Sequence, residues 1–460
     1  MTAPAKPAIH VYCGPTITPA EARDLIPAAI THPPVRHGDL LALELRPGDT
    51  VVIIDGVFHQ APPCRHKEIL DLLARGVRVV GAASMGALRA AELESYGMTG
   101  IGTIFSAYRD GLLTADDEVA VAHTPDDNRQ LSLALADIRA AVAAGTADDV
   151  ISADQAAAII CRARQLHYSR RTWPDLQQSA GGNTSLQTAV RQMARWHAAR
   201  PGADAKHADA VTALELAAAG DLPTPPDPAW TAGPWENYHL HHWRARYRGV
   251  VIDGIRVPYL ATLRHQQLYD PGFPARWERH VMSWIARALA PASTPHDDDA
   301  KASAIAAADA AGLSLRYLST SQLAYWLTPA EITTLAAHEQ LTRLLVRSVP
   351  QDPTAASLWP AAANDAPGLV DPAMGSDRAF AAAARNNDQV ADSGPHRSIY
   401  SLRRDRIRLD LAGRWGLDPT DDTALTAAAR DRGFHAIAGA VEAARPFFLS
   451  LLEAITNTGC

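Results

Sequence analysis

The sequence has 460 residues, more than one ordinary domain holds, and this length predicts roughly two to four domains. Hydrophobic residues make up 47% of the chain and charged residues 20%, which is typical of a folded protein with a large core and excludes a disordered chain. The formal net charge of −7, from 43 Lys+Arg against 50 Asp+Glu, disfavours nucleic acid and membrane as partners. Only a local basic patch would allow the chain to bind either of them.

Cysteine spacing and the N-terminal sequence indicate the compartment. The cysteines Cys13, Cys64, Cys161 and Cys460 are scattered and form no C-x-x-C pair, which disfavours a disulfide framework and a zinc site and fits a reducing cytosol. The N-terminus lacks a charged segment followed by an apolar one, and nowhere do about 18 apolar residues run without interruption. We expect a cytoplasmic protein without signal peptide, transmembrane helix or bound metal.

Short β-branched runs alternate with helical spacing near the N-terminus. Strand-like runs lie at 9–12, 51–54 and 77–80, and the last two are nearly all apolar, as in strands covered on both faces. Between them, residues 66–76 place apolar side chains three and four positions apart and end on a glycine, which predicts a helix. Another helix is predicted at about 85–96. This order predicts a parallel sheet with right-handed crossovers.

The chain becomes rich in alanine and helical in spacing from about residue 137. Helices are predicted at 137–144, 152–169 (capped by Ser152), 184–199 and 205–219. A proline cluster at 222–228 predicts a linker. The predicted fold class is α/β: an N-terminal parallel-sheet domain followed by a predominantly α-helical extension. The boundaries are an α/β core at 1–135, a helical part of the same domain at 136–221, a helical region of unknown role at 236–348 and a C-terminal helical region at 376–460.

The sharpest local sign of chemistry is Ser84, which lies where a buried strand turns directly into a helix. Ala82 two positions before it and Gly86 two positions after it approximate the G-x-S-x-G nucleophile elbow. In such a turn the hydroxyl projects from the carboxyl edge of the sheet, and the amides of Met85 and Gly86 point to the same place, where they hold an oxyanion or a phosphate. The alternative is that Ser84 only caps the helix.

Two further groups are candidates for the same edge. Asp55 follows the second strand, where open α/β sheets bind ligands, and it fits equally well as a cap of the next loop. His66, Lys67 and Glu68 open the following helix, and a lysine in the first turn opposes the helix dipole, which points to function. If this turn faces Ser84, Lys67 or His66 acts as base or oxyanion partner and Glu68 orients it. The alternative is that these residues form only a solvent-exposed first turn of the helix.

An acidic cluster, Asp116, Asp117 and Glu118, precedes His123. Carboxylates grouped in this way bind hard cations such as Mg²⁺. A solvated turn that leads into an apolar segment explains the pattern as well. Together with Asp55, the cluster supports a metal-dependent phosphohydrolase as a second alternative function.

Taken together, these segments resemble the TfuA family. The most specific blocks are His66-Lys67-Glu68-Ile69-Leu70 and the run SMGALRAAE that begins at Ser84, in this order and spacing. The resemblance spans about residues 8–220. Its other blocks are Gly14-Pro15, Pro33-Pro34…Gly38-Asp39-Leu40, Ile54-Asp55-Gly56, Gly97-Met98-Thr99-Gly100-Ile101-Gly102, Asp116-Asp117-Glu118-Val119-Ala120…His123, Tyr168…Arg171 and Lys206…Asp209-Ala210.

The resemblance implies a pathway and partners. TfuA proteins act beside YcaO-type enzymes, which use ATP to activate a peptide backbone amide and convert it to a thioamide in ribosomally made, post-translationally modified peptides. It implies that this chain supplies the sulfur, by releasing sulfide from a thiocarboxylated ThiS-like carrier protein. The implied partners are the YcaO-type cyclodehydratase or thioamide synthetase, the carrier and a precursor peptide, with ATP and Mg²⁺ on the YcaO partner and no cofactor on this chain.

Sulfide release from a thiocarboxylate is an acyl transfer, which needs an activated nucleophile and an oxyanion site, and the Ser84 turn offers both. A cation is also needed because the thiocarboxylate is anionic, and Lys67 and Arg89 are the candidates. We therefore predict an accessory hydrolase or sulfur-transfer enzyme. The alternative is a non-catalytic partner that binds the carrier and activates the YcaO enzyme, which the Trp-, Tyr- and Arg-rich stretch at 235–284 favours.

Overall fold

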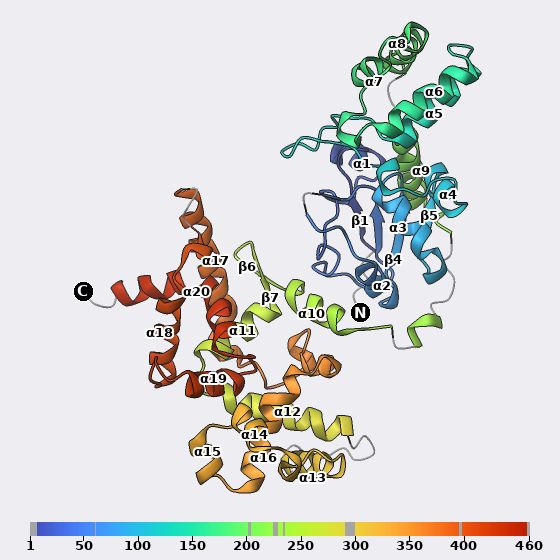
Figure 1. The fold of residues 1–460 in the computed structure, drawn as a ribbon. Coiled ribbons are helices and arrows are strands. Elements are labelled where there is room, and N and C mark those ends of the chain that lie inside the picture. The colour runs from blue at the N-terminus through green and yellow to red at the C-terminus, as the bar shows by residue number, and fades with distance from the viewer. Residues whose placement is uncertain are drawn as a thin grey trace. The chain divides into compact units, whose positions relative to one another are not determined.

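A computed structural model describes residues 7–59, 61–200, 204–223, 229–232, 235–289, 300–394 and 398–457 (Figure 1). The chain forms two compact units, Met1–Trp235 and Glu236–Cys460, each with hydrophobic cores of its own. Most of the predicted proline linker, residues 224–228, lies outside the described residues, as does Cys460.

The first unit is built on a five-stranded parallel sheet in the order β2-β1-β3-β4-β5. This confirms the predicted α/β class. The sequence pattern misses β2 and β5, because each is only a short stretch in which no period can show itself. The strands are β1 (Ile9–Tyr12), β2 (Ile30–His32), β3 (Thr50–Ile53), β4 (Arg78–Ala82) and β5 (Thr99–Ile101).

Helices cover both faces of this sheet, as the apolar strands predict. In chain order they are α1 (Pro19–Leu25), α2 (His66–Ala74), α3 (Met85–Leu93), α4 (Thr103–Arg109), α5 (Leu135–Ala147), α6 (Ala153–Gln165), α7 (Trp173–Ser179), α8 (Thr184–Ala198) and α9 (Ala205–Ala219). Val51 and Ile53 belong to one core, with α2, α3 and α4, whereas Val52 and Ile54 belong to a second core, with α1 and α9. The return of α9 to the sheet completes the second layer.

Helices α5 to α8 form a further core of the first unit. Ser152 caps α6 as predicted, because its Oγ accepts a hydrogen bond from the Gln155 N–H at 3.3 Å. The predicted helix at 152–169 is longer than the observed one, since α6 ends at Gln165 and a separate 3-10 turn, Tyr168–Arg170, follows it.

The second unit is mostly helical, which confirms the predicted helical extension. The helical pattern at 236–290 misses one hairpin, β6 (Gly249–Ile252) with β7 (Ile255–Pro258), although its Asp253-Gly254 turn is a known hairpin sequence. No described helix of either unit is both long and apolar enough to cross a bilayer. The helices are α10 (Tyr238–Tyr247), α11 (Tyr259–Tyr269), α12 (Phe273–Leu289), α13 (Ala300–Ala310), α14 (Thr320–Trp326), α15 (Pro329–Thr334), α16 (Ala337–Ser348), α17 (Ser376–Asp392), α18 (Arg404–Trp415), α19 (Asp422–Arg430) and α20 (Ile437–Asn457).

Candidate functional site

The turn from β4 into α3 is tight and strained. β4 ends at Ala82 and α3 begins at Met85, so only Ala83 and Ser84 make the turn. Ala83 is fully buried at a φ of 65°, in the left-handed region that residues other than glycine rarely adopt. The Ser84 side chain makes no hydrogen bond to the first turn of α3, so it does not act as the helix cap. The hydroxyl is therefore presented away from its own helix.

Gly86 lets α3 pack directly on β3. Its N–H donates to the Ile54 carbonyl at 3.3 Å, and a Cβ at this position would lie 1.7 Å from the Ile53 carbonyl oxygen. Only glycine permits so close a backbone approach. The Gly86 amide is thus used inside the fold, which corrects the expectation that it binds an anion. The Met85 amide has no hydrogen-bond partner among the described residues and remains the candidate oxyanion donor.

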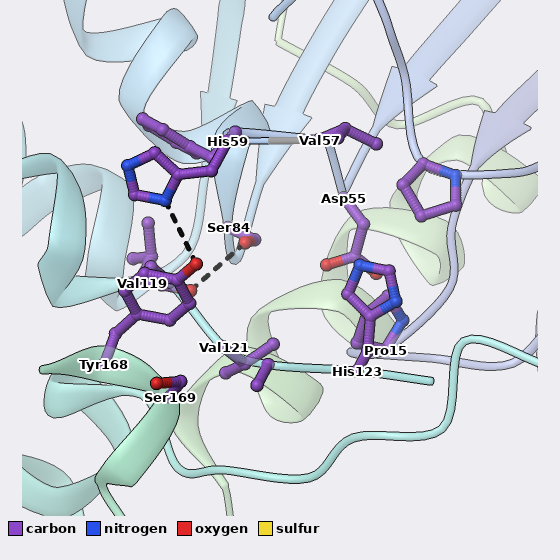
Figure 2. Close-up of a pocket in the computed structure, with 15 residues that line it drawn as sticks. Pro15, Asp55, Val57, His59, Ser84, Val119, Val121, His123, Tyr168 and Ser169 are labelled. Atoms are coloured by element: carbon purple, nitrogen blue, oxygen red, sulfur yellow. Dashed lines mark hydrogen bonds between the residues drawn. The ribbon is translucent and has the colours of Figure 1, made fainter. Parts of the chain in front are cut away.

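Ser84 lines a cavity of about 220 Å³ at the carboxyl edge of the sheet (Figure 2). Asp55 enters it from the end of β3, and His123 from the loop after the acidic cluster. The structure therefore brings together three residues that the sequence analysis selected from separate segments. The turn at residues 168–169 closes part of the same cavity, through Tyr168 and Ser169.

Asp55 is held in place by the loop after β1. It is 3% exposed, and its two carboxylate oxygens accept hydrogen bonds from Thr16, at 3.0 Å from the N–H and 2.6 Å from Oγ1. Its carbonyl accepts a further bond from the Val35 N–H at 2.9 Å. Asp55 therefore holds the loops after β1 and β2 and is also a polar group of the cavity. Its side-chain bonds go to Thr16 and not to the following loop, which the capping interpretation expected.

Imidazole and phenol groups form the polar side of the cavity. His59 Nδ1 lies 3.0 Å from the Tyr168 hydroxyl, and the two rings stack with centroids 5.4 Å apart (Figure 2). His123 Nδ1 lies 3.0 Å from the Thr124 carbonyl oxygen. Within the described part of the chain, no hydrogen bond joins His123 to Ser84, so a Ser–His pair is not formed in this structure.

A buried lysine lies beside Ser84, and the sequence analysis does not select it for the site. Lys206, on α9, is 1% exposed, and its Nζ donates to the Val119 carbonyl at 3.0 Å. Ser84 is 8% exposed, and its hydroxyl donates to the same carbonyl at 3.4 Å. The ammonium and the hydroxyl therefore share one acceptor, the Val119 carbonyl. Ser84 and Val119 line the cavity, whereas Lys206 is not among its lining residues.

Lys206 sits on the buried face of α9, where charged residues are rare unless they are paired. Its backbone N–H donates to Asp137 Oδ1 at 3.0 Å. Burial raises the pKa of Asp137 to about 6, and the nearby Lys206 charge opposes this rise. The sequence does carry one sign of this arrangement, because Lys206 and Asp209 fall on the same helical stripe as the buried Ala210 and Ala213.

Lys67 and His66 lie in the first turn of α2 and are engaged elsewhere. Lys67 Nζ donates to the Trp235 carbonyl, and His66 Nε2 lies 2.8 Å from Glu92 Oε2. Neither side chain lines the cavity with Ser84. This corrects the expectation that the first turn of α2 faces Ser84.

Glu68 and Arg89 hold segments of the fold together. Glu68 is fully buried and accepts hydrogen bonds from the Gly38 N–H at 2.8 Å and the Arg65 N–H at 3.0 Å. Arg89 Nε donates to the Cys64 carbonyl at 3.2 Å, which ties α3 to the start of α2. Neither residue lines the cavity, and the Arg89 guanidinium donates to the Cys64 carbonyl and not to the Val119 carbonyl that Ser84 contacts.

The acidic cluster is divided among ion pairs. Arg139 donates to both oxygens of Glu118, at 2.9 and 2.8 Å, and the buried Arg171 pairs with Asp117. Asp116 is exposed and does not line the cavity. Throughout the described ranges, no group of three or more His, Cys, Asp or Glu side chains is arranged to hold a metal ion. The metal-dependent phosphohydrolase hypothesis therefore lacks a donor set among these residues.

Asp209 holds α9, and with it Lys206, against α4. Its carboxylate accepts hydrogen bonds from the N–H groups of Thr103 and Ile104, both at 2.8 Å. We predict that Asp209→Ala lowers the free energy of unfolding by about 2 kcal/mol, because both donors lose their partner, and the Ile104 N–H loses it in a buried place. Urea unfolding measures this. Asp209→Asn keeps one acceptor oxygen and should lose about half as much; an alanine variant as stable as the native chain would contradict the prediction.

Comparison with known proteins assigns part of the first unit to a family. Residues 55–172 match the TfuA-like protein family. The match confirms the resemblance to TfuA proteins over these residues, which include Asp55, Ser84 and His123, and it supports a role associated with YcaO-type enzymes. Lys206 lies outside the matched residues. No curated protein matches the chain.

Proposed function

We propose that this chain, whose residues 55–172 form a TfuA-like region, supplies sulfur to a YcaO-type partner that installs a thioamide in the backbone of a ribosomally made peptide. The sulfur is released as sulfide from a thiocarboxylated ThiS-like carrier protein, by hydrolysis in the cavity at Ser84. One observation carries this proposal: the Ser84 hydroxyl and the Lys206 ammonium meet on the Val119 carbonyl. Attack on an anionic acyl group needs both a nucleophile and a cation.

The proposed reaction has two steps. In the first, Ser84 Oγ attacks the carbonyl carbon of R–C(=O)S⁻, the C–S bond breaks, and the hydroxyl proton leaves with the sulfur as HS⁻. The product is an ester of Ser84. In the second step, water attacks this ester and yields R–COO⁻, the free hydroxyl and one proton. Asp55, which lines the same cavity, accepts that proton.

Lys206 and Met85 have electrostatic roles in this scheme. Attack on an anion builds further negative charge in the transition state, and a site shielded from water disfavours this unless a cation lies nearby. The Lys206 ammonium supplies the positive charge, in place of Lys67 and Arg89, and the Met85 N–H donates to the developing oxyanion. Neither step needs a cofactor on this chain, and ATP and Mg²⁺ act on the YcaO partner.

Lys206→Met should lower the rate of sulfide release about 100-fold, because it removes the charge and keeps the length of the side chain. The matched control is Lys67→Met, which removes a lysine that donates to the Trp235 carbonyl and not to the Val119 carbonyl beside Ser84, and should keep the native rate. The loss should fall on kcat rather than on KM, with the thermal unfolding temperature of each variant recorded beside it. A native kcat in Lys206→Met, or an equal loss in both lysine variants, would remove Lys206 from the mechanism.

The proposed function is tested by incubating the purified chain with thiocarboxylated carrier and trapping sulfide, with and without the YcaO partner. Sulfide release above the rate of the carrier alone, in the absence of the partner, is expected. Release that stays at that background with and without the partner, while the partner's thioamide formation is stimulated by the chain, would reject hydrolysis.

A second candidate function is a non-catalytic partner that binds the YcaO enzyme and the carrier and activates the former. One observation favours it: among the described residues, no histidine or carboxylate is hydrogen-bonded to Ser84 Oγ, which donates instead to a carbonyl. A hydroxyl that contacts no base is consistent with a site that only binds. It is equally consistent with the proposed reaction, in which the sulfur of the substrate takes the proton. The sulfide assay separates the two.

A further inference from the structure

The second unit contains a cavity of about 230 Å³ that the proposed function does not use. Helices α10, α11 and α20 and the loops around Trp359 and Phe434 enclose it. The residues that line it are apolar or aromatic, with two histidines and one tyrosine among them. Arg264, on α11, is the charged residue of this lining.

Arg264 has few partners for a guanidinium. Its Nη1 donates to Gln267 Oε1 at 2.7 Å, and no other hydrogen bond to this group is made by the described residues. Its Cζ lies 5.7 Å from the ring centroid of Trp359 and 4.9 Å from that of Phe434, so the charge lies against two aromatic rings. None of its nitrogen atoms is both enclosed and unpaired. The remaining N–H groups are therefore not fully enclosed by protein, and Arg264 is one of the residues that line the cavity.

No carboxylate of the described residues neutralises this charge. Burial lowers the pKa of Arg264 to about 10, so the fold holds the cation at an energetic disadvantage. By contrast, the buried Arg347 of the same unit pairs with Glu331 and Asp431, each at 2.7 Å. Such pairing is the usual way to keep an arginine inside a protein. Because its charge is not neutralised in this way, Arg264 can bind an anionic ligand.

The other titratable groups that line the cavity do not supply that anion. They are Tyr238, His242 and His435, and no acidic residue is among them. Burial, and next the charge of Arg264, lower the pKa of His242, which keeps this imidazole neutral near pH 7. The cavity therefore combines one cation with aromatic walls.

We propose that this cavity binds an organic carboxylate, with the carboxylate on Arg264 and the apolar part of the ligand against Trp359 and Phe434. The planar guanidinium presents parallel N–H groups that fit the two oxygens of a carboxylate. One arginine neutralises the single negative charge of a carboxylate. A phosphate dianion would keep one uncompensated negative charge among apolar residues, which is costly. Such a ligand comes either as a free small acid or as the terminal or side-chain carboxylate of a peptide.

The binding test uses the full chain with benzoate as probe, and benzamide and inorganic phosphate as controls. Benzoate should quench tryptophan fluorescence and raise the thermal unfolding temperature, since a ligand of the folded state stabilises it. Benzamide, of the same shape but neutral, should bind at least about 10-fold more weakly, as should phosphate. Equal binding of benzamide, or no response to benzoate up to about 10 mM, would overturn the proposal.

The source of the carboxylate is distinguished by a pair of Ala-Ala-Phe peptides, one with a free C-terminal carboxylate and one amidated. Tighter binding of the free peptide than of benzoate points to a peptide ligand. Tighter binding of benzoate points to a small acid. Both results keep the carboxylate assignment, whereas equal binding of the amidated and free peptides contradicts it.

Arg264→Met should weaken benzoate binding at least about 10-fold and raise the unfolding temperature of the ligand-free chain, because it removes a partly buried charge that no described carboxylate neutralises. Arg316→Met is the matched control, since Arg316 is an exposed arginine of the same unit that also lies over an aromatic ring, and it should change neither value. If Arg264→Met fails to fold, Arg264→Lys keeps the charge without the planar fork and should also bind about 10-fold more weakly. Native benzoate affinity in the Arg264 variant that folds would overturn the assignment.

Discussion

Ser84→Ala is expected to reduce sulfide release from the thiocarboxylated carrier at least about 100-fold, because it removes the nucleophile of the first step. The fold should be unaffected. The side chain does not cap α3, and its one hydrogen bond, to the Val119 carbonyl, is long at 3.4 Å. Initial rates of sulfide trapping measure the activity, and thermal unfolding measures the stability of the variant.

Ser169→Ala is the matched control for this experiment. Ser169 lines the same cavity from the 3-10 turn after α6, but it is exposed and not part of the strand-to-helix turn. Its variant should release sulfide at the native rate. Intact mass spectrometry adds a second readout, because the native chain, and not Ser84→Ala, should carry a transient ester with the carrier. Native turnover in Ser84→Ala would leave the non-catalytic partner as the function of this cavity.

The sheet could be predicted from sequence where its pattern is local. β3 and β4 are nearly all apolar, and the spacing of α2 ends at Gly76, which has a φ of 76°. β5 escapes such an analysis because it has only 3 residues and Gly100 lies in the middle of them. A Cβ at Gly100 would lie 2.1 Å from the ring of Phe105, so glycine is needed there for packing that the local sequence does not reveal.

The candidate site could be predicted only in part, for a topological reason. Ser84 meets the end of β3 because the carboxyl ends of neighbouring parallel strands share one edge of the sheet. Lys206 reaches the same place across 87 residues from Val119, a contact that depends on how α5 to α9 fold back. Lys67 lies in the first turn of its helix at the expected edge, but its side chain is held by a hydrogen bond to the carbonyl of Trp235, 168 residues away. Strand ends are predictable from topology, whereas these two lysines are placed by tertiary packing.

Gly86→Ala is expected to destabilise the first unit by about 3 kcal/mol or more, through overpacking at the contact between α3 and β3. The added methyl group would lie 1.7 Å from the Ile53 carbonyl oxygen, which belongs to the backbone and has no side-chain rotamer to relieve the clash. Gly81 offers no room on the other side, since its Cα would lie 3.2 Å from the new carbon. Helix α3 must therefore move off the sheet, which also breaks the hydrogen bond from the Gly86 N–H to the Ile54 carbonyl.

Urea unfolding and amide hydrogen exchange of the full chain measure this effect, and exchange should accelerate most at β3 and α3. Gly182→Ala is the matched control in the same unit, because no atom lies within 4 Å of a Cβ built there, and its variant should unfold like the native chain. Ser84→Ala removes chemistry and keeps the fold, whereas Gly86→Ala removes the packing that presents Ser84. Sulfide release should therefore fall in both variants, but unfolding should change only in the glycine variant. Native exchange at α3 in Gly86→Ala would mean that the helix does not pack on the strand this closely, and the tight turn at Ser84 would lose its structural basis.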